Sequence, residues 1–250
     1  MKTDKKGNIQ IQSLIRRQPV RQFGAGFASL ALAGFTLASV SLAQTSIVCD
    51  PAGDPTYAGA KGGPKIAAWL DIVQAEVADA GSDIHFTLTL NAAVPAAPAW
   101  KAVDDGGQLW WGWRFVDDLA NDTVVKDGCV KSAGSLIPAG YFLDLIWEVS
   151  SASFHARLLD DTTCAQNEVP YAFSSDRKQI TMVVAKSLVT NGAIIPNPNA
   201  FEFFASTLAW KANKTGNNSF FTLDLTPNEN NGQLVAVPWS ASGNATYFCP

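Results

Sequence analysis

The stretch Ile84-His85-Phe86-Thr87-Leu88-Thr89-Leu90-Asn91 decides the fold class, because apolar and polar residues alternate along its whole length. Successive side chains of a β-strand point to opposite faces of the sheet. A period of two therefore predicts a strand with one buried face. The fold of the chain follows from how often this pattern recurs on either side of it.

A second stretch, Leu109-Trp110-Trp111-Gly112-Trp113-Arg114-Phe115, repeats the alternation with larger side chains. Here the core face is expected to carry Leu109, Trp111, Trp113 and Phe115. The opposite face carries Trp110 and Arg114. Further strands are predicted at about 69–78, 141–150, 153–159, 179–185, 200–211 and 219–225.

Turn-forming residues separate these strands. Ala80-Gly81-Ser82-Asp83 and Ser150-Ser151-Ala152 are expected to join hairpins, and clusters of Pro, Asn, Asp and Gly fill the longer connections. A single helical turn is expected in residues 186–191, and no long stretch shows a 3.6-residue period. The pattern predicts an all-β domain of about eight to ten strands, an antiparallel two-sheet β-sandwich of jelly-roll type, with a barrel as the alternative.

The first 43 residues are typical of an export signal. Six basic residues precede an uncharged apolar run at 23–42, which ends in Ser41-Leu42-Ala43, a small-x-small cleavage pattern. A membrane anchor is the alternative, because the run is long enough to span a bilayer. We favour cleavage after Ala43. The expected organisation is a signal peptide at 1–43 and a single domain at 44–250, secreted or periplasmic.

The net charge of the expected domain indicates which classes of partner it disfavours. Residues 44–250 hold 12 basic and 21 acidic side chains, a formal charge of −9. An acidic protein repels nucleic acid and anionic lipid, so neither is an expected partner. The sequence does not indicate an oligomeric state.

Four cysteines follow the signal segment, and an even number in an exported chain predicts two disulfides. Three pairings are possible. We prefer Cys49–Cys249, which ties the ends of the domain, and Cys129–Cys164, which closes a shorter loop. A zinc site is disfavoured because the chain has no C-x-x-C pair.

The opening Cys49-Asp50-Pro51-Ala52-Gly53-Asp54 and the order of the later strands, down to Asp224-Leu225-Thr226-Pro227, resemble a group of secreted bacterial proteins. These proteins are similar to DOMON and family-9-type carbohydrate-binding sandwiches. The resemblance implies an antiparallel sandwich that binds a sugar or a cofactor, and it implies no reaction. Some DOMON-type domains bind haem through Met and His. Here Met182 is expected in the core and His155 on the solvent side, so haem is not expected.

Three carboxylates are the candidate metal ligands: Asp50, Asp54 and Asp71. Asp50 and Asp54 flank a Gly/Pro loop, and Asp71 lies where the next strand begins. Calcium takes six to eight oxygen ligands, which such a loop supplies from carboxylates and carbonyls, so a structural calcium ion is a possible cofactor. The alternative is ordinary turn chemistry, since Asp50 and Asp54 each precede a proline.

The candidate ligand-binding residues are Trp110, Arg114 and Trp100. The aromatic face of an exposed tryptophan stacks on a sugar ring, so Trp110 would be the platform if it is exposed. Trp100, in a Pro/Ala loop, would line the same edge. The alternative is that these tryptophans fill the space between the sheets.

No catalytic motif is present. Asp144 and Glu148 share one strand face but lie too far apart for a retaining glycosidase. We therefore expect an exported, non-catalytic binding domain with carbohydrate as the favoured ligand. A structural domain of the cell envelope or surface is the alternative, and a polysaccharide hydrolase or lyase is the second alternative. If the sandwich has no groove and Trp110 is packed, the structural alternative is preferred.

Overall fold

The computed structural model describes residues 44–55, 66–100, 107–116, 140–161, 163–189, 197–211, 219–227 and 235–249. The predicted signal segment 1–43 and the predicted disulfide partner Cys129 lie outside these ranges. The strands are β1 (Thr45–Cys49), β2 (Ile72–Ala80), β3 (Asp83–Leu90), β4 (Gln108–Val116), β5 (Tyr141–Glu148), β6 (Ser153–Asp160), β7 (Gln166–Glu168), β8 (Tyr171–Phe173), β9 (Gln179–Ala185), β10 (Ala200–Lys211), β11 (Ser219–Thr226), β12 (Val237–Ser240) and β13 (Ala245–Tyr247). Two short 3₁₀ turns, η1 (Ala68–Leu70) and η2 (Lys186–Leu188), precede β2 and follow β9.

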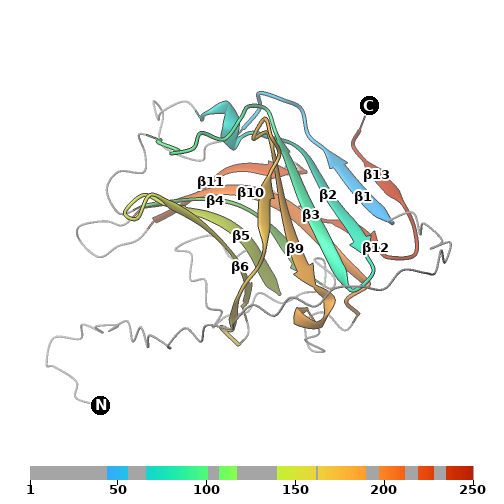
Figure 1. The fold of residues 1–250 in the computed structure, drawn as a ribbon. Coiled ribbons are helices and arrows are strands. Elements are labelled where there is room, and N and C mark those ends of the chain that lie inside the picture. Colours follow the sequence, from blue (N-terminus) through green and yellow to red (C-terminus); the bar gives the residue numbers. More distant parts are fainter. Residues whose placement is uncertain are drawn as a thin grey trace, which may run out of the picture. The chain divides into compact units, whose positions relative to one another are not determined.

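The strands form two sheets packed face to face, which confirms the predicted β-sandwich (Figure 1). We call the sheet with the order β13-β1-β2-β3-β9-β8 sheet A. Sheet B has the order β11-β10-β4-β5-β6-β7, with β12 also paired to β10. All pairings are antiparallel except β1 with β13. No helix within the described ranges has the length and apolar character to cross a membrane.

The alternation of residues 84–90 and 109–115 determines the core as expected. Phe86 of β3 contacts Trp113 and Phe115 of β4 across the gap between the sheets, with ring centroids 5.5 and 5.4 Å apart. Phe201 of β10 and Trp239 of β12 continue this aromatic layer at 4.7 Å. Rings packed at these separations add attraction to the burial of their apolar area.

Both predicted hairpin turns are confirmed. Gly81 joins β2 to β3 with φ +79°, a conformation that glycine adopts without steric cost. Ala152 adopts φ 49° in the turn between β5 and β6. The predicted helical turn is limited to η2. Five short strands were not predicted: β1, β7, β8, β12 and β13.

Two of these short strands carry the chain from one sheet to the other. β7 is the edge strand of sheet B and β8 is the edge strand of sheet A. Only Val169 and Pro170 separate them. Val169 is buried, and its N–H donates to the Ala156 carbonyl at 3.2 Å, which holds the crossing against β6.

The two ends of the domain are joined. A disulfide links Cys49 at the end of β1 to Cys249 after β13, with 4.8 Å between the Cα atoms, as predicted. Ser46 of β1 also donates to the Pro238 carbonyl of β12, which connects sheet A to sheet B at 3.2 Å. Cys164 is disulfide-bonded as well.

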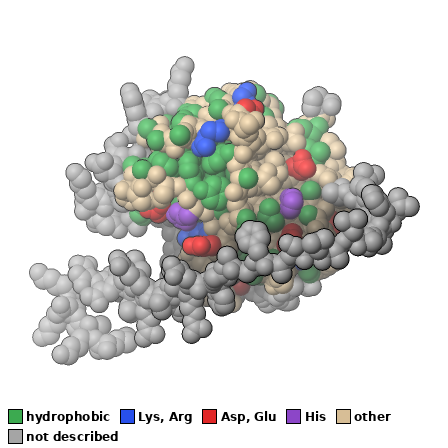
Figure 2. Space-filling view, in the orientation of Figure 1, with side chains coloured by type: hydrophobic (Ala, Val, Ile, Leu, Met, Phe, Trp, Pro, Cys, Tyr) green, Lys and Arg blue, Asp and Glu red, His purple; other side chains and the backbone are tan. Residues whose placement is uncertain are grey.

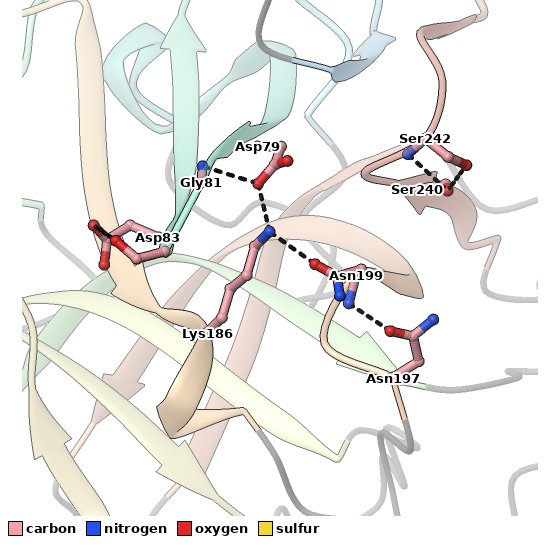
Figure 3. Close-up of polar contacts among 9 residues, drawn as sticks. Asp79, Gly81, Asp83, Lys186, Asn197, Asn199, Ser240 and Ser242 are labelled. Atoms are coloured by element: carbon pink, nitrogen blue, oxygen red, sulfur yellow. Dashed lines mark hydrogen bonds and ion pairs between the residues drawn. The ribbon is translucent and has the colours of Figure 1, made fainter. Parts of the chain in front are cut away.

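A polar network links the two sheets near the β2–β3 turn (Figure 3). The ammonium group of Lys186, in η2, lies 2.6 Å from a carboxylate oxygen of Asp79 and donates to the side-chain carbonyl of Asn199 at 2.7 Å. Asp79 belongs to β2, whereas Asn199 immediately precedes β10. Lys186 therefore connects sheet A to the first residues of the longest strand of sheet B.

Candidate metal centre

Three carboxylates converge at one end of the sandwich. Asp50 and Asp54 come from the loop after β1, and Asp224 comes from β11 of the other sheet. Each offers a carboxylate oxygen, and these three oxygens lie within 4.8 Å of one another. Such a separation allows one cation to contact all three.

The sequence predicted two of these three residues. Asp71, the third predicted ligand, lies beside the group and also holds its loop in place. One of its oxygens, Oδ2, accepts hydrogen bonds from the Gly53 N–H and from the Asn91 side-chain amide, both at 2.8 Å. Asp71 therefore holds the Asp50–Asp54 loop against sheet A. Gly53 has φ +90°, which suits a glycine at the point where the loop turns.

Asp224 was missed as a ligand because a β-bulge changes the face of the strand on which it lies. Strict alternation would place Thr222 and Asp224 on the same face. The pairing of β10 with β11 shifts between Thr207 and Leu208, so Leu208 pairs with Thr222 and Thr207 pairs with Asp224. A bulge adds one residue to one strand and reverses the alternation beyond it. Asp224 thus turns inward and accepts a hydrogen bond from the Ile72 N–H of sheet A at 2.6 Å.

Burial and the nearness of other carboxylates disfavour the charged forms of Asp50 and Asp224. Burial, with the neighbouring carboxylates of Asp54 and Asp71, raises the pKa of Asp50 to about 7, although the hydrogen bond from Thr226 opposes the rise. Burial also raises the pKa of Asp224 to about 8, against the Ile72 hydrogen bond and with help from Asp50 and Asp71. Carboxyl groups that repel one another in a dry site hold their protons more tightly. A bound cation would reverse this effect.

The donor set fits calcium. Asp224 and Asp71 are fully buried, and in each of them the oxygen Oδ1 has no hydrogen-bond partner in the described part of the chain. A buried carboxylate oxygen without a partner is costly unless a cation or a donor meets it. All candidate ligands here are oxygens, which hard cations such as calcium prefer. Thr226, whose hydroxyl donates to Asp50 at 3.2 Å, lies next to the group.

The predicted sugar platform is not exposed. Trp110 does lie on the outer face of sheet B, opposite the core, as predicted, but its side chain is only 4% exposed. The Arg157 guanidinium covers its ring at 5.0 Å, and its indole N–H donates to the Gln108 side chain at 2.8 Å. The condition for stacking on a sugar, an open ring face, is therefore not met at Trp110.

The two other predicted ligand-binding residues are also buried. Trp100 belongs to the hydrophobic core between the sheets and does not lie beside Trp110. Arg114 is fully buried on the outer face of sheet B and forms an ion pair with Asp144 at 2.7 Å. Trp111, Trp113 and Met182 are in the core, as predicted. Of the two carboxylates considered for catalysis, Asp144 pairs with Arg114 and Glu148 accepts a hydrogen bond from Gln108.

Charged side chains are sparse on the face of the domain seen in Figure 2, where acidic and basic side chains are scattered among hydrophobic and uncharged ones. Among the described residues, the exposed large hydrophobic side chains are Tyr171, Leu188 and Phe248, which belong to separate segments of the chain. Neither charge nor exposed aromatic residues mark a second site as clearly as the three carboxylates do.

The chain was compared with protein-family models, curated proteins and solved structures, and none of the three comparisons found a match.

Proposed function

We propose that this chain is an exported, non-catalytic structural domain of the cell envelope or cell surface, and that one calcium ion completes its fold. The observation that carries this proposal is the meeting of Asp50 and Asp54, from the loop after β1 of sheet A, with the buried Asp224 of β11 in sheet B. A calcium ion bound there would join the segment after β1 to β11, next to the disulfide that joins the ends of the domain.

The burial of the group favours a structural ion over a catalytic pair of carboxylates. Asp224 is fully buried and is bonded to the backbone of β2, so a polymer substrate does not reach it. Extracellular calcium is abundant enough to fill sites of modest affinity, with dissociation constants of about 10⁻⁴ to 10⁻³ M in extracellular modules. An exported domain therefore gains stability from such a site without needing tight binding.

Carbohydrate stacking on Trp110 is not part of this proposal, because the ring is packed. The resemblance to carbohydrate-binding sandwiches supports a shared fold as strongly as it supports a carbohydrate ligand. It therefore does not by itself favour carbohydrate binding. The packed Trp110 meets one of the two conditions under which the sequence favours a structural domain that meets other envelope proteins through its loops; the other condition is the absence of a groove.

The test is thermal unfolding of the exported protein in EDTA and in millimolar calcium. We expect calcium to raise the melting temperature, and we expect Asp50→Asn to remove most of that increase. Asp83→Asn is the matched control, because it removes one carboxylate at the β2–β3 turn, the opposite end of β2 from Asp71. Equal calcium responses in the wild type and in Asp50→Asn would refute the proposal.

A further inference from the structure

A row of polar side chains crosses the outer face of sheet B. Cross-strand pairing places Ser206 of β10 beside Gly112 of β4, Gly112 beside Asp144 of β5, and Asp144 beside Arg157 of β6. Paired residues of neighbouring antiparallel strands point to the same face. We call Ser206, Gly112, Asp144 and Arg157, with the Arg114 side chain that reaches into them, the polar row.

Gly112, which has no side chain, lies within the polar row and leaves space above its backbone. A Cβ atom at position 112 would overlap the Leu143 carbonyl oxygen and the Asp144 carboxylate, and it would lie 3.2 Å from the Arg114 Nη1 atom. Arg114 therefore uses the space above Gly112 to donate from Nη1 to Asp144 at 2.7 Å and to the Trp113 carbonyl at 2.8 Å. Its guanidinium also lies 4.5 Å from the ring centre of Phe142.

Only part of the hydrogen-bonding capacity of the polar row is used. Arg114, Asp144 and Ser206 are fully buried. Yet Arg114 Nε and Nη2, Arg157 Nε, Ser206 Oγ and Asp144 Oδ2 have no hydrogen-bond partner in the described part of the chain. Buried polar atoms are nearly always paired, so five unpaired atoms in one row indicate a group that completes them.

The unpaired atoms define the chemistry of that group. Four of the five atoms belong to groups that donate, and the neighbouring Nε–H and Nη2–H of one guanidinium form a fork that matches two oxygens of a carboxylate or a sulfate. The polar row itself carries two positive charges and one negative charge. Burial and Arg114 lower the pKa of Arg157, and Asp144 and Glu148 oppose that effect. A small anion therefore suits the row better than a neutral ligand.

Apolar side chains line both sides of the polar row. Phe204 and Phe142 flank it on one side, and Trp110, Ile146 and Leu208 flank it on the other. Few water molecules compete with a charge-assisted hydrogen bond in such surroundings, which strengthens the bond. The full burial of Arg114 and Ser206 also excludes contact with the face of a sugar ring.

We propose that the polar row binds an oxyanion group, a carboxylate or a sulfate, on the free fork of Arg114 with Ser206 and Arg157 as further donors. This inference is independent of the calcium proposal, because the two sites use different residues on different parts of the sandwich. It assigns a role to Arg114, which the sequence singled out as a ligand-binding residue, through hydrogen bonds in place of stacking beside Trp110.

The test uses the full exported protein at constant ionic strength in a chloride background, in EDTA. Sulfate, glucuronate and the neutral sugar glucose are titrated while the melting temperature is recorded. We expect a saturable increase with sulfate, glucuronate or both, and none with glucose. A response to sulfate alone identifies an inorganic ligand, whereas a stronger response to glucuronate identifies an acidic sugar.

Two variants locate the site. Ser206→Ala changes one hydroxyl and is expected to weaken anion binding several-fold, and Arg114→Lys, which keeps the charge but loses the fork, is expected to abolish it. Lys178→Gln removes a positive charge from an exposed position and is expected to bind like the wild type. If Arg114→Lys does not fold, Ser206→Ala still decides. Absence of a saturable anion response in the wild type, or equal weakening in Ser206→Ala and Lys178→Gln, would overturn the proposal.

Discussion

Asp224→Asn should stabilise this domain in the absence of calcium and should lose most of that advantage when calcium is present. Burial raises the pKa of Asp224 to about 8, so at about pH 7.5 the folded protein mostly keeps this carboxyl protonated. The unfolded chain, with a carboxyl pKa of about 3.9, has released the proton. The raised pKa therefore lowers the free energy of unfolding progressively as the pH rises from about 4 to about 8. Asp50 acts in the same direction up to about pH 7.

The size of this effect follows from the same values. Each unit by which the pKa is raised corresponds to about 1.4 kcal/mol, so keeping Asp224 uncharged at pH 7.5 costs about 5 kcal/mol. The asparagine amide carries no such cost, and its carbonyl oxygen still accepts from the Ile72 N–H. Allowing for imperfect pairing of the buried amide, we expect a net gain of about 2–4 kcal/mol in EDTA. In a domain of this size that is an increase of at least about 5 °C in melting temperature.

Calcium should cancel most of this advantage of the variant. The wild type gains about 2.7 kcal/mol when free calcium is 100 times the dissociation constant, whereas Asp224→Asn lacks a ligand and gains much less. Differential scanning calorimetry in EDTA and in calcium, for the wild type, Asp224→Asn and the control Asp83→Asn, measures both effects. If Asp224→Asn is less stable than the wild type in EDTA at pH 7.5, burial does not disfavour the charged form of Asp224 as argued, and the reasoning fails.

Three further predictions concern the scaffold. Replacing both Cys49 and Cys249 with serine should lower the free energy of unfolding, measured in urea, by up to about 5 kcal/mol, because the disulfide closes a loop of 200 residues; an unchanged urea midpoint would show that the bond does not constrain the unfolded chain. Gly112→Ala should cost about 1–3 kcal/mol, because the new methyl group overlaps the Leu143 carbonyl and the Asp144 carboxylate; a melting temperature equal to that of the wild type would contradict the packing described for the polar row. Lys186→Ala should cost no more than about 1 kcal/mol, because its ion pair with Asp79 is partly exposed and therefore screened; a loss of several kcal/mol would mean that this network is a main connection between the sheets.

Long strands were predictable because each buries one face. Residues 84–90 and 109–115 show a clear period of two, and β9 and β10 begin and end where the sequence predicted. The short strands lack this signal. β7 consists of Gln166, Asn167 and Glu168, all exposed, and β12 contains Pro238, which has no N–H to donate to a neighbouring strand. These strands form because the chain crosses or ends beside a strand already in place.

The candidate metal centre was only partly predictable, for a similar reason. Asp50 and Asp54 are close in sequence, so a loop between them indicates a shared site. Asp224 joins them only through the packing of one sheet on the other and through a β-bulge that alternation does not reveal. Asp224-Leu225-Thr226-Pro227 is part of the family resemblance, but that resemblance implies no role for the Asp224 carboxylate.

Trp110 shows what the alternation of apolar and polar residues cannot predict even where it places a side chain on the correct face. Alternation placed it correctly on the face opposite the core, together with Arg114. Alternation gives the direction of a side chain and not what lies against it, so the burial of this outer face could not be foreseen. The sequence likewise could not predict the unpaired atoms of Arg114, because they depend on how Gly112, Asp144 and Arg157 align across neighbouring strands.

Calorimetric titration of calcium into EDTA-stripped, exported protein at pH 8 tests the central claim most directly. The account predicts one calcium ion per chain, with an affinity that falls as the pH is lowered through 7, because protons then compete for Asp50 and Asp224. A folded protein that takes up no calcium at millimolar concentration would contradict it.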